Sequence, residues 1–191
     1  DLIFPHHENE IAQSEAANGK EFAKYWMHNG FLNIDNRKMS KSLGNFLTVR
    51  DVSQKVNPLV LRFFLASVHY RSPLNFSPEG LEQAKAALER LNNCYADMLF
   101  ALENRAAGEA DEALRAAVKG SEEGFTAAMD DDFNTAGAVG CIFEMVRAVN
   151  VHLTEHQEID KEALTEAKAL FEKTDNILGY LYEEKEAGDE E

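Results

Sequence analysis

The chain has 191 residues, 45% of them hydrophobic, and 34 acidic against 19 basic side chains give it a net charge of −15. This length can bury a core in one or two globular domains, and four prolines and eleven glycines are too few for a low-complexity chain. No apolar run reaches the ~18 residues that cross a bilayer, no secretory signal is visible, and only two cysteines occur, so we expect a cytoplasmic protein without a membrane span.

The first motif is a cluster of ligand-type side chains, PHHENE, at residues 5–10. If a helix begins at Pro5, His6 and Glu10 lie four residues apart and project from one face, about one turn from each other. An imidazole nitrogen and a carboxylate oxygen suit Zn²⁺, which usually takes four ligands. A hydrogen-bonded surface pair has the same spacing, so the pattern alone leaves both interpretations open.

The second motif is KMSKSLGNF at residues 38–46. It follows a predicted hairpin over residues 30–37 and precedes TVRD at residues 48–51, which resembles a capping box that opens a helix. Lys38 and Lys41 could offset the charge that grows on a leaving pyrophosphate, while Ser40 and Ser42 bond its oxygens. An ordinary basic turn is the alternative.

A change in composition divides the chain. Residues 1–76 carry a net charge of +2 and residues 77–191 a net charge of −17, and all four prolines lie in the first 78 residues. This predicts a boundary near residues 74–78, with a first region at 1–76, a helical region at 77–183 and an acidic tail at 184–191. A single domain with an acidic tail is the alternative.

The region after residue 76 is strongly periodic. Ser77 followed by Pro78 is typical of a helix start. Apolar residues then recur at alternating steps of three and four, which predicts four helices of roughly 20 residues in an antiparallel bundle. The expected inward positions are Leu81, Ala84, Leu88, Leu91, Tyr95, Met98 and Leu102; Leu114, Ala117, Ser121, Phe125 and Ala128; Val139, Ile142, Val146, Val149 and Leu153; and Leu164, Ala167, Phe171, Thr174, Leu178 and Leu181.

Two further features of the bundle could suggest a metal site. We expect Cys94 and Cys141 to be small, partly buried helix residues rather than ligands. The aspartates at 130–132 could bind a cation, but carboxylates also favour the positive end of a helix. We therefore expect them to flank the start of the helix that Asn134 or Thr135 caps.

Several segments together resemble the cysteinyl-tRNA synthetases. KMSKS at 38–42 is similar to the nucleotide loop of the Rossmann-type aminoacyl-tRNA synthetases, and residues 1–14 and 25–30 resemble segments of the cysteinyl members. Residues 57–72 resemble their stem-contact region, and DDFNT at 131–135 a stretch of their tRNA-binding bundle. The resemblance implies a mainly α chain, in which the remnant of a Rossmann-type catalytic domain with the KMSKS stem-contact region precedes an antiparallel helical bundle of DALR type.

The resemblance also implies a function. The family activates L-cysteine with ATP and Mg²⁺ as an adenylate and then transfers it to tRNA(Cys). By position, His6 and Glu10 match the last two of four zinc ligands, and zinc favours a deprotonated sulfur over a hydroxyl. His7 and Glu8 could orient these ligands.

The resemblance also implies roles for residues of the KMSKS loop. Lys41 matches the loop lysine that acts on ATP and the transition state, Lys38 is its supporting charge, and Ser40 and Ser42 are expected to bind ATP.

Other parts of the family's sequence have no counterpart here. The HIGH motif, both cysteine zinc ligands and the anticodon segment are absent, so we expect an internal fragment that is inactive alone, binds zinc weakly and is monomeric. Two other functions stay open. One is a ligase that joins cysteine to an amino sugar through the same chemistry, and the other is a non-catalytic helical interaction module.

Overall fold

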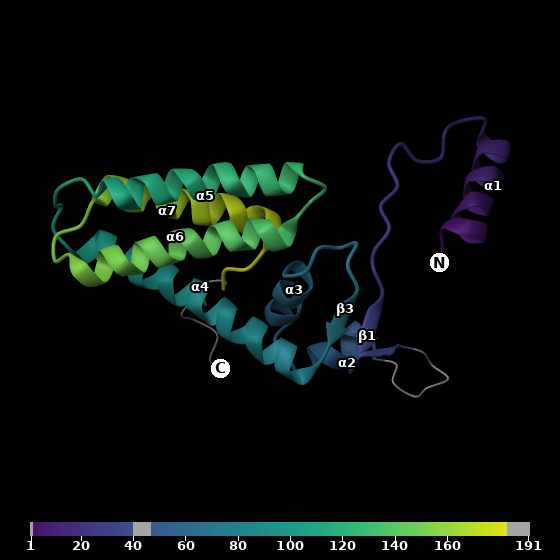
Figure 1. Cartoon of the computed structure of the whole chain (residues 1–191), viewed down its shortest axis with the longest axis horizontal. Helices are drawn as coiled ribbons and strands as arrows, with labels where there is room; N and C mark the ends of the chain where they lie inside the picture. Colours follow the sequence, from purple (N-terminus) through teal and green to yellow (C-terminus); the bar gives the residue numbers. More distant parts are fainter. Residues whose placement is uncertain (1, 40–46, 183–191) are drawn as a thin grey trace, which may run out of the picture.

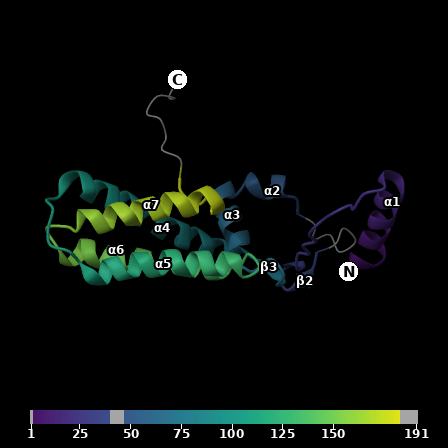
Figure 2. The same ribbon diagram turned by 90° about the horizontal axis from the view of Figure 1, so that it is seen from above.

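The computed structural model describes residues 2–39 and 47–182 and is mostly helical, as the sequence predicts. Figure 1 and Figure 2 show an elongated molecule with a helical bundle at one end and α1 at the other. The elements are η1 (Ile3–His7), α1 (Glu8–Asn18), β1 (Leu32–Ile34), β2 (Arg37–Lys38), α2 (Val49–Ser53), α3 (Pro58–Ala66), β3 (Leu74–Phe76), α4 (Pro78–Asn104), α5 (Glu112–Asp130), α6 (Thr135–Glu155) and α7 (Lys161–Leu178).

A small sheet lies between α1 and the bundle. Its strand order is β2-β1-β3, with β1 antiparallel to β2 and parallel to β3. Asp35 and Asn36 form the turn of the predicted hairpin, with φ values of 47° and 60° that both residue types tolerate. The Asn36 N–H donates to Asn75 Oδ1 at 2.7 Å, which ties the turn to β3.

The segment between the sheet and the bundle begins with two capped helices. Thr48 and Asp51 form the predicted capping box at the start of α2. Asn57 caps α3, and Pro58 occupies its first turn, where a missing N–H costs nothing. The apolar face of α3 packs against α4, and Phe64 meets Phe76 of β3 edge to face, with ring centroids 5.8 Å apart.

The four predicted bundle helices are α4 to α7. Most of the predicted inward residues are buried, but Cys94 and Ala101 are buried in α4 where the heptad pattern favours Tyr95 and Leu102. The buried face of α4 turns because the helix packs against α3 as well as against α6 and α7. Both cysteines are free, and burial raises the pKa of the Cys94 thiol to about 12, as expected for an inert core residue.

The aspartates at 130–132 precede the start of α6, and Asn134 caps this helix, as the sequence predicts. Asp130 is the last residue of α5, and α6 is capped by Asn134, whose side chain accepts the Gly137 N–H at 2.9 Å. Asp132 lies in the turn between these helices, where its carboxylate bonds Tyr70 and Arg71. The local pattern predicted the helix start but not the contact of Asp132 with residues distant in the sequence.

By length and composition alone, helix α6 could cross a membrane, with a mean hydropathy of 1.2 over 18 residues, although Glu144 and Arg147 interrupt its apolar residues. Its most apolar positions, including Ile142, Val146 and Val149, are buried in the bundle. Core packing therefore accounts for its composition.

Two aspartates join α5 and α7 at the end of the bundle far from the sheet. Asp111 caps α5 and Asp160 caps α7, and Asp160 also accepts the Asp111 N–H at 2.9 Å and the Arg115 guanidinium at 2.8 Å. Burial opposes ionisation of Asp160, but the bonds from Arg115 and from the Asp111 and Ala163 N–H groups outweigh it and lower the pKa of this carboxyl to about 2.

This lowered pKa predicts an acid-sensitive bundle. A carboxyl whose pKa falls on folding stabilises the protein above its unfolded pKa, and this contribution is lost as the pH falls through the folded value. We expect the free energy of unfolding to fall by on the order of 2 kcal/mol from this group between about pH 4 and pH 2. Urea unfolding followed by circular dichroism at several pH values measures it.

Two variants separate Asp160 from the other carboxylates. Asp160→Asn should flatten the pH dependence in this window, whereas Asp130→Asn, at an exposed position, should not. If the Asp160→Asn protein keeps the parent's pH dependence, the carboxylate does not contribute as described.

Candidate functional site

The predicted metal ligands lie at the start of the N-terminal helix. The chain kinks at Phe4, and from Pro5 the end of η1 continues into α1, so His6 and Glu10 are one turn apart on the helix, as the spacing predicts. Both side chains are exposed, and neither has a hydrogen-bond partner in the described part of the chain. The surface-pair interpretation required a mutual hydrogen bond, and none joins them.

In the described part of the chain, no hydrogen bond or ion pair joins the side chains of His7 and Glu8 to this pair. The His7 ring stacks on His28 and on Trp26, with ring centroids 4.9 and 5.1 Å away, and His7 Nδ1 lies 2.8 Å from His28 Nε2. The stack folds residues 25–29 back over the start of α1. His7 therefore holds this segment in place, and its pairing with His28, 21 positions away, gives no signal in the local pattern.

The residues present fit half of a zinc site. His6 and Glu10 supply one nitrogen and one carboxylate donor, and no third histidine, cysteine or acidic group joins them among residues 2–39 and 47–182. Both cysteines lie in bundle helices. A four-ligand site would therefore need two donors from outside the described residues.

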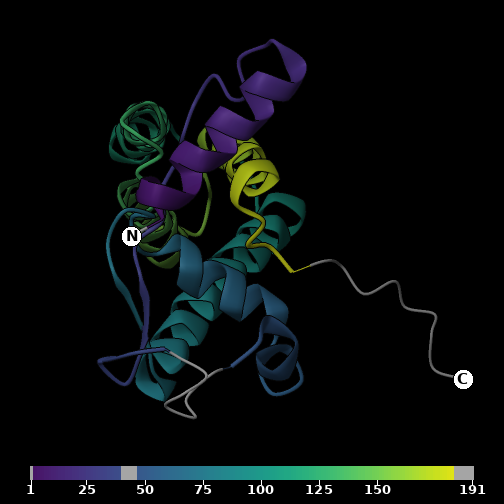
Figure 3. The same cartoon turned by 90° about the vertical axis from the view of Figure 1, so that its right-hand side faces the viewer.

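The KMSKS motif begins on the hairpin. Lys38 is the last residue of β2, is exposed, and its Nζ lies 5.5 Å from the centroid of the Phe31 ring. Ser40, Lys41 and Ser42 lie outside the described residues. Figure 1 and Figure 3 place the hairpin and α1 on the same side of the bundle, joined by the extended residues 19–31.

The N-terminal segment at residues 2–31 exposes many large apolar side chains. In the described chain, half of the large exposed hydrophobic residues fall within residues 2–31: Leu2, Ile3, Phe4, Phe22, Tyr25, Trp26, Met27 and Phe31. Helix α1 packs against η1 but makes no extensive contact with another described helix or strand. Exposed apolar side chains gathered in one part of a protein are typical of a surface that another protein segment covers.

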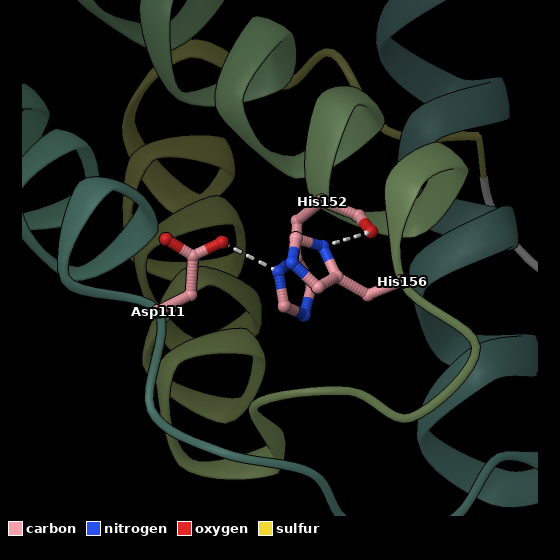
Figure 4. A group of neighbouring side chains, drawn as sticks. All are labelled: Asp111, His152 and His156. Carbon is pink, nitrogen blue, oxygen red and sulfur yellow. Dashed lines mark hydrogen bonds and ion pairs between the residues drawn. The ribbon is translucent and has the colours of Figure 1, made fainter.

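A second group of metal-type side chains occurs in the bundle. Asp111, His152 and His156 place their ligand atoms within 4.8 Å of one another (Figure 4). His152 is only 1% exposed, and its Nδ1 lies 2.7 Å from an Asp111 oxygen. His156 is exposed, and its Nδ1 lies 3.2 Å from the His152 carbonyl oxygen.

The tautomer of His152 argues against a metal. Its Nε2 accepts the Asp160 N–H at 3.0 Å, so the proton of the neutral ring is on Nδ1 and is donated to Asp111. A metal on Nδ1 would move that proton to Nε2, where it would face the Asp160 N–H. The histidine therefore joins the starts of α5 and α7, a role that the apolar periodicity did not reveal.

The bundle's arginines fall into two pairs. Arg105 donates to the carbonyl oxygens of Leu153 and His156, and Arg115 bonds acidic side chains of the same bundle end. Arg90 and Arg147 instead line one groove of about 330 Å³ that faces solvent beside α6, where the Arg90 guanidinium also lies 4.8 Å from the centre of the Phe143 ring. A polyanion would therefore meet two arginines here, and not four.

We expect His152→Ala to lower the free energy of unfolding by about 2–4 kcal/mol, because it leaves the Asp160 N–H and the Asp111 carboxylate without their partner. His156→Ala, at an exposed position, should change it by less than about 0.5 kcal/mol. Thermal unfolding with and without Zn²⁺ completes the test. A metal site here would instead raise the parent's melting temperature with zinc, and either substitution would abolish that rise.

Two protein families match the chain. The family described as "tRNA synthetases class I (C) catalytic domain" matches residues 1–86, and the family described as "DALR domain" matches residues 124–182. Among solved structures, the chain is similar to the "ternary complex of Agrobacterium radiobacter K84 agnB2 LeuRS-tRNA-LeuAMS", with a TM-score of 0.74, 18% identity, and coverage of 93% of this chain and 24% of that one. This likeness shows the fold alone.

Curated relatives are much closer in sequence. The chain is 53% identical over 182 residues to a protein of Caldicellulosiruptor saccharolyticus named "Cysteine--tRNA ligase", covering 95% of this chain and 38% of that protein. Proteins of the same name from Geobacter sulfurreducens and a Geobacillus species are 53% and 48% identical, with 38% and 41% of their lengths covered. The chain is therefore homologous to cysteine–tRNA ligases over nearly its whole length, and it spans about two fifths of the length of these relatives.

Proposed function

We propose that this chain is part of a ligase that activates L-cysteine with ATP and transfers it to tRNA(Cys). The observation that carries the proposal is the exposed His6–Glu10 pair, on the same side of the bundle as the hairpin that leads into the KMSKS loop. Its support from sequence is the match to relatives of that name over nearly the whole chain. The substrates and partners belong to the longer protein.

The metal chemistry follows from the donor set. His6 and Glu10 would hold zinc together with two donors from the part of the ligase that this chain does not span. When bound, zinc would supply a Lewis acid that prefers a thiolate to a hydroxyl, and a bond that forms with cysteine but not with serine discriminates strongly between them. His7, Trp26 and His28 would hold the neighbouring segment in place through their ring stack.

The KMSKS loop would bind ATP. Lys38 lies on β2 at the start of the motif, and Lys41, Ser40 and Ser42 follow it in the sequence. We propose that Lys41 offsets the charge on the leaving pyrophosphate, that Lys38 supports it, and that the two serine hydroxyls bond phosphate oxygens with Mg²⁺ present.

We propose the same three regions that the sequence predicts: 1–76, 77–183 and a tail at 184–191. The rest of the ligase would cover the apolar residues exposed between Leu2 and Phe31. In the bundle, the groove lined by Arg90 and Arg147 is our candidate for contact with tRNA phosphates.

The two other functions have less support. The relatives are named for a tRNA ligase, and the chain carries a DALR match, so transfer to an amino sugar is less well supported. A non-catalytic module would leave the exposed His6–Glu10 pair and the KMSKS motif without a role.

The test uses the full-length ligase that carries this segment. We expect Lys41→Ala to lower the kcat of cysteine-dependent ATP–pyrophosphate exchange by at least about 100-fold with the KM for cysteine within about twofold, because the lysine acts on the transition state. Lys20→Ala is the control, since it removes the same charge outside the motif. Equal loss of rate and of cysteine affinity would contradict the role of Lys41, and absence of exchange in the parent would contradict the proposed function.

A further inference from the structure

Residues 69–72 connect the bundle to the sheet through contacts on both of their sides. On the bundle side, the Tyr70 hydroxyl donates to Asp132 Oδ1 at 2.7 Å. Arg71 Nε lies 2.5 Å from Asp132 Oδ2, and its Nη2 donates to Oδ1 at 3.2 Å. His69 Nε2 is 4.0 Å from the same carboxylate. One aspartate thus meets three consecutive side chains that lie more than 60 positions away.

The Asp132 carboxylate is fixed relative to the bundle. Asp132 and Phe133 have φ values of 57° and 54°. Aspartate tolerates such a value, but for the bulky Phe133 it is costly and persists only where surrounding contacts hold it. The Phe133 N–H donates to the Met129 carbonyl at 3.2 Å, and the Asn134 N–H donates to that of Ala128 at 3.0 Å. The turn therefore moves with α5 and α6.

On the side of the sheet, residues 69–74 bond the two residues that lead into β1, Gly30 and Phe31. The Gly30 N–H donates to the Tyr70 carbonyl at 2.6 Å, and the Leu74 N–H donates to the Phe31 carbonyl at 2.9 Å. A Cβ on Gly30 would lie 2.3 Å from the Ser72 carbonyl oxygen, so only glycine permits this approach. From Phe31 the chain runs directly through the hairpin to Lys38.

The ion pair between Arg71 and Asp132 adds little to the stability of the fold. The Arg71 and Asp132 side chains are 64% and 40% exposed, and ion pairs at such positions are weak. The geometry is nevertheless specific, since two of the carboxylate's bonds come from one guanidinium and a third from the neighbouring phenol. Such an arrangement is better suited to aligning residues 69–72 with the α5–α6 turn than to raising the free energy of unfolding.

We propose that Asp132 is a positioning residue, which holds residues 69–72 on the α5–α6 turn and thereby sets the place of the β1–β2 hairpin, and of the KMSKS motif that begins on it, relative to the bundle. This inference rests on the proposed function, in which the bundle binds tRNA and the motif binds ATP. Cysteine activation needs no tRNA, so the contact should matter for transfer to tRNA and not for adenylate formation.

The experiment compares Asp132→Asn with Asp131→Asn. Asparagine tolerates positive φ, so the first substitution keeps the turn and removes the charge. The second makes the same chemical change at an exposed neighbour whose side chain has no hydrogen-bond or ion-pair partner in the described chain. Tyr70→Phe removes one bond to Asp132 from the other side and serves as a second variant, should Asp132→Asn fold poorly.

Two measurements are made. Hydrogen exchange on this chain should show the amides of residues 30–34 exchanging about tenfold faster in Asp132→Asn than in Asp131→Asn, with rates in α5 and α6 unchanged. In the full-length ligase, the kcat of tRNA charging should fall about tenfold, whereas tRNA-independent pyrophosphate exchange should change less than about twofold. Tyr70→Phe should change both in the same direction by a smaller factor.

Three outcomes would overturn the inference. The first is parent-like exchange at residues 30–34 in Asp132→Asn, and the second is charging equal to that of Asp131→Asn. The third is equal loss of charging and of tRNA-independent exchange, which would mean that Asp132 supports the catalytic domain as a whole. If the parent ligase shows no cysteine-dependent exchange, the proposed function fails, while the hydrogen-exchange comparison still decides whether Asp132 holds the hairpin.

Discussion

The packing of α4 against two different partners is the constraint on which the rest of the structure depends. Its 27 residues contact α3 and β3 as well as α6 and α7, so one continuous helix belongs to the core of both halves. A helix of this length cannot bend freely between them, because its N–H and C=O groups are bonded within it. The Arg62 guanidinium of α3 adds a bond to the Leu178 carbonyl at the end of α7. These contacts thereby fix the position of the KMSKS hairpin relative to the bundle.

The polar side chains of the bundle and those of the N-terminal helix have different roles. At one end of the bundle, three side chains bond backbone groups and carboxylates where the helices begin and end: Arg105, Arg115 and His152. His6 and Glu10 are left without such bonds, at the opposite end of the molecule. Unbonded donors on an exposed helical turn are available to a ligand, whereas the bonded histidine of the bundle is not.

Local sequence predicted most of the fold. The alternating steps of three and four identify α4 to α7, and the Asp35–Asn36 turn and the capping box at Thr48 identify the hairpin and α2, because each depends on neighbours in the chain. Contacts between distant residues were not predictable in this way. The bonds of Asp132 gave no local signal because its partners lie some 60 residues earlier, and Cys94 replaces Tyr95 in the core because α4 changes partners along its length.

For the site, spacing placed His6 and Glu10 correctly on one helical turn, since this depends only on the geometry of the helix. The resemblance supplied their role. Neither could show that His7 would stack on Trp26 and His28, because that contact forms only when the chain turns back after α1. The position of Lys38 on β2 was likewise fixed by pairing with β1, and not by the motif itself.

The central claim is that His6 and Glu10 are two ligands of a zinc ion that selects cysteine. The most direct measurement is the zinc content of the purified full-length ligase and of its His6→Ala, Glu10→Gln and Glu8→Gln variants by elemental analysis. The account predicts about one zinc per chain in the parent and in Glu8→Gln, and a loss of most of it in the other two, since zinc needs its full ligand set. Parent-like zinc content in both His6→Ala and Glu10→Gln would contradict it.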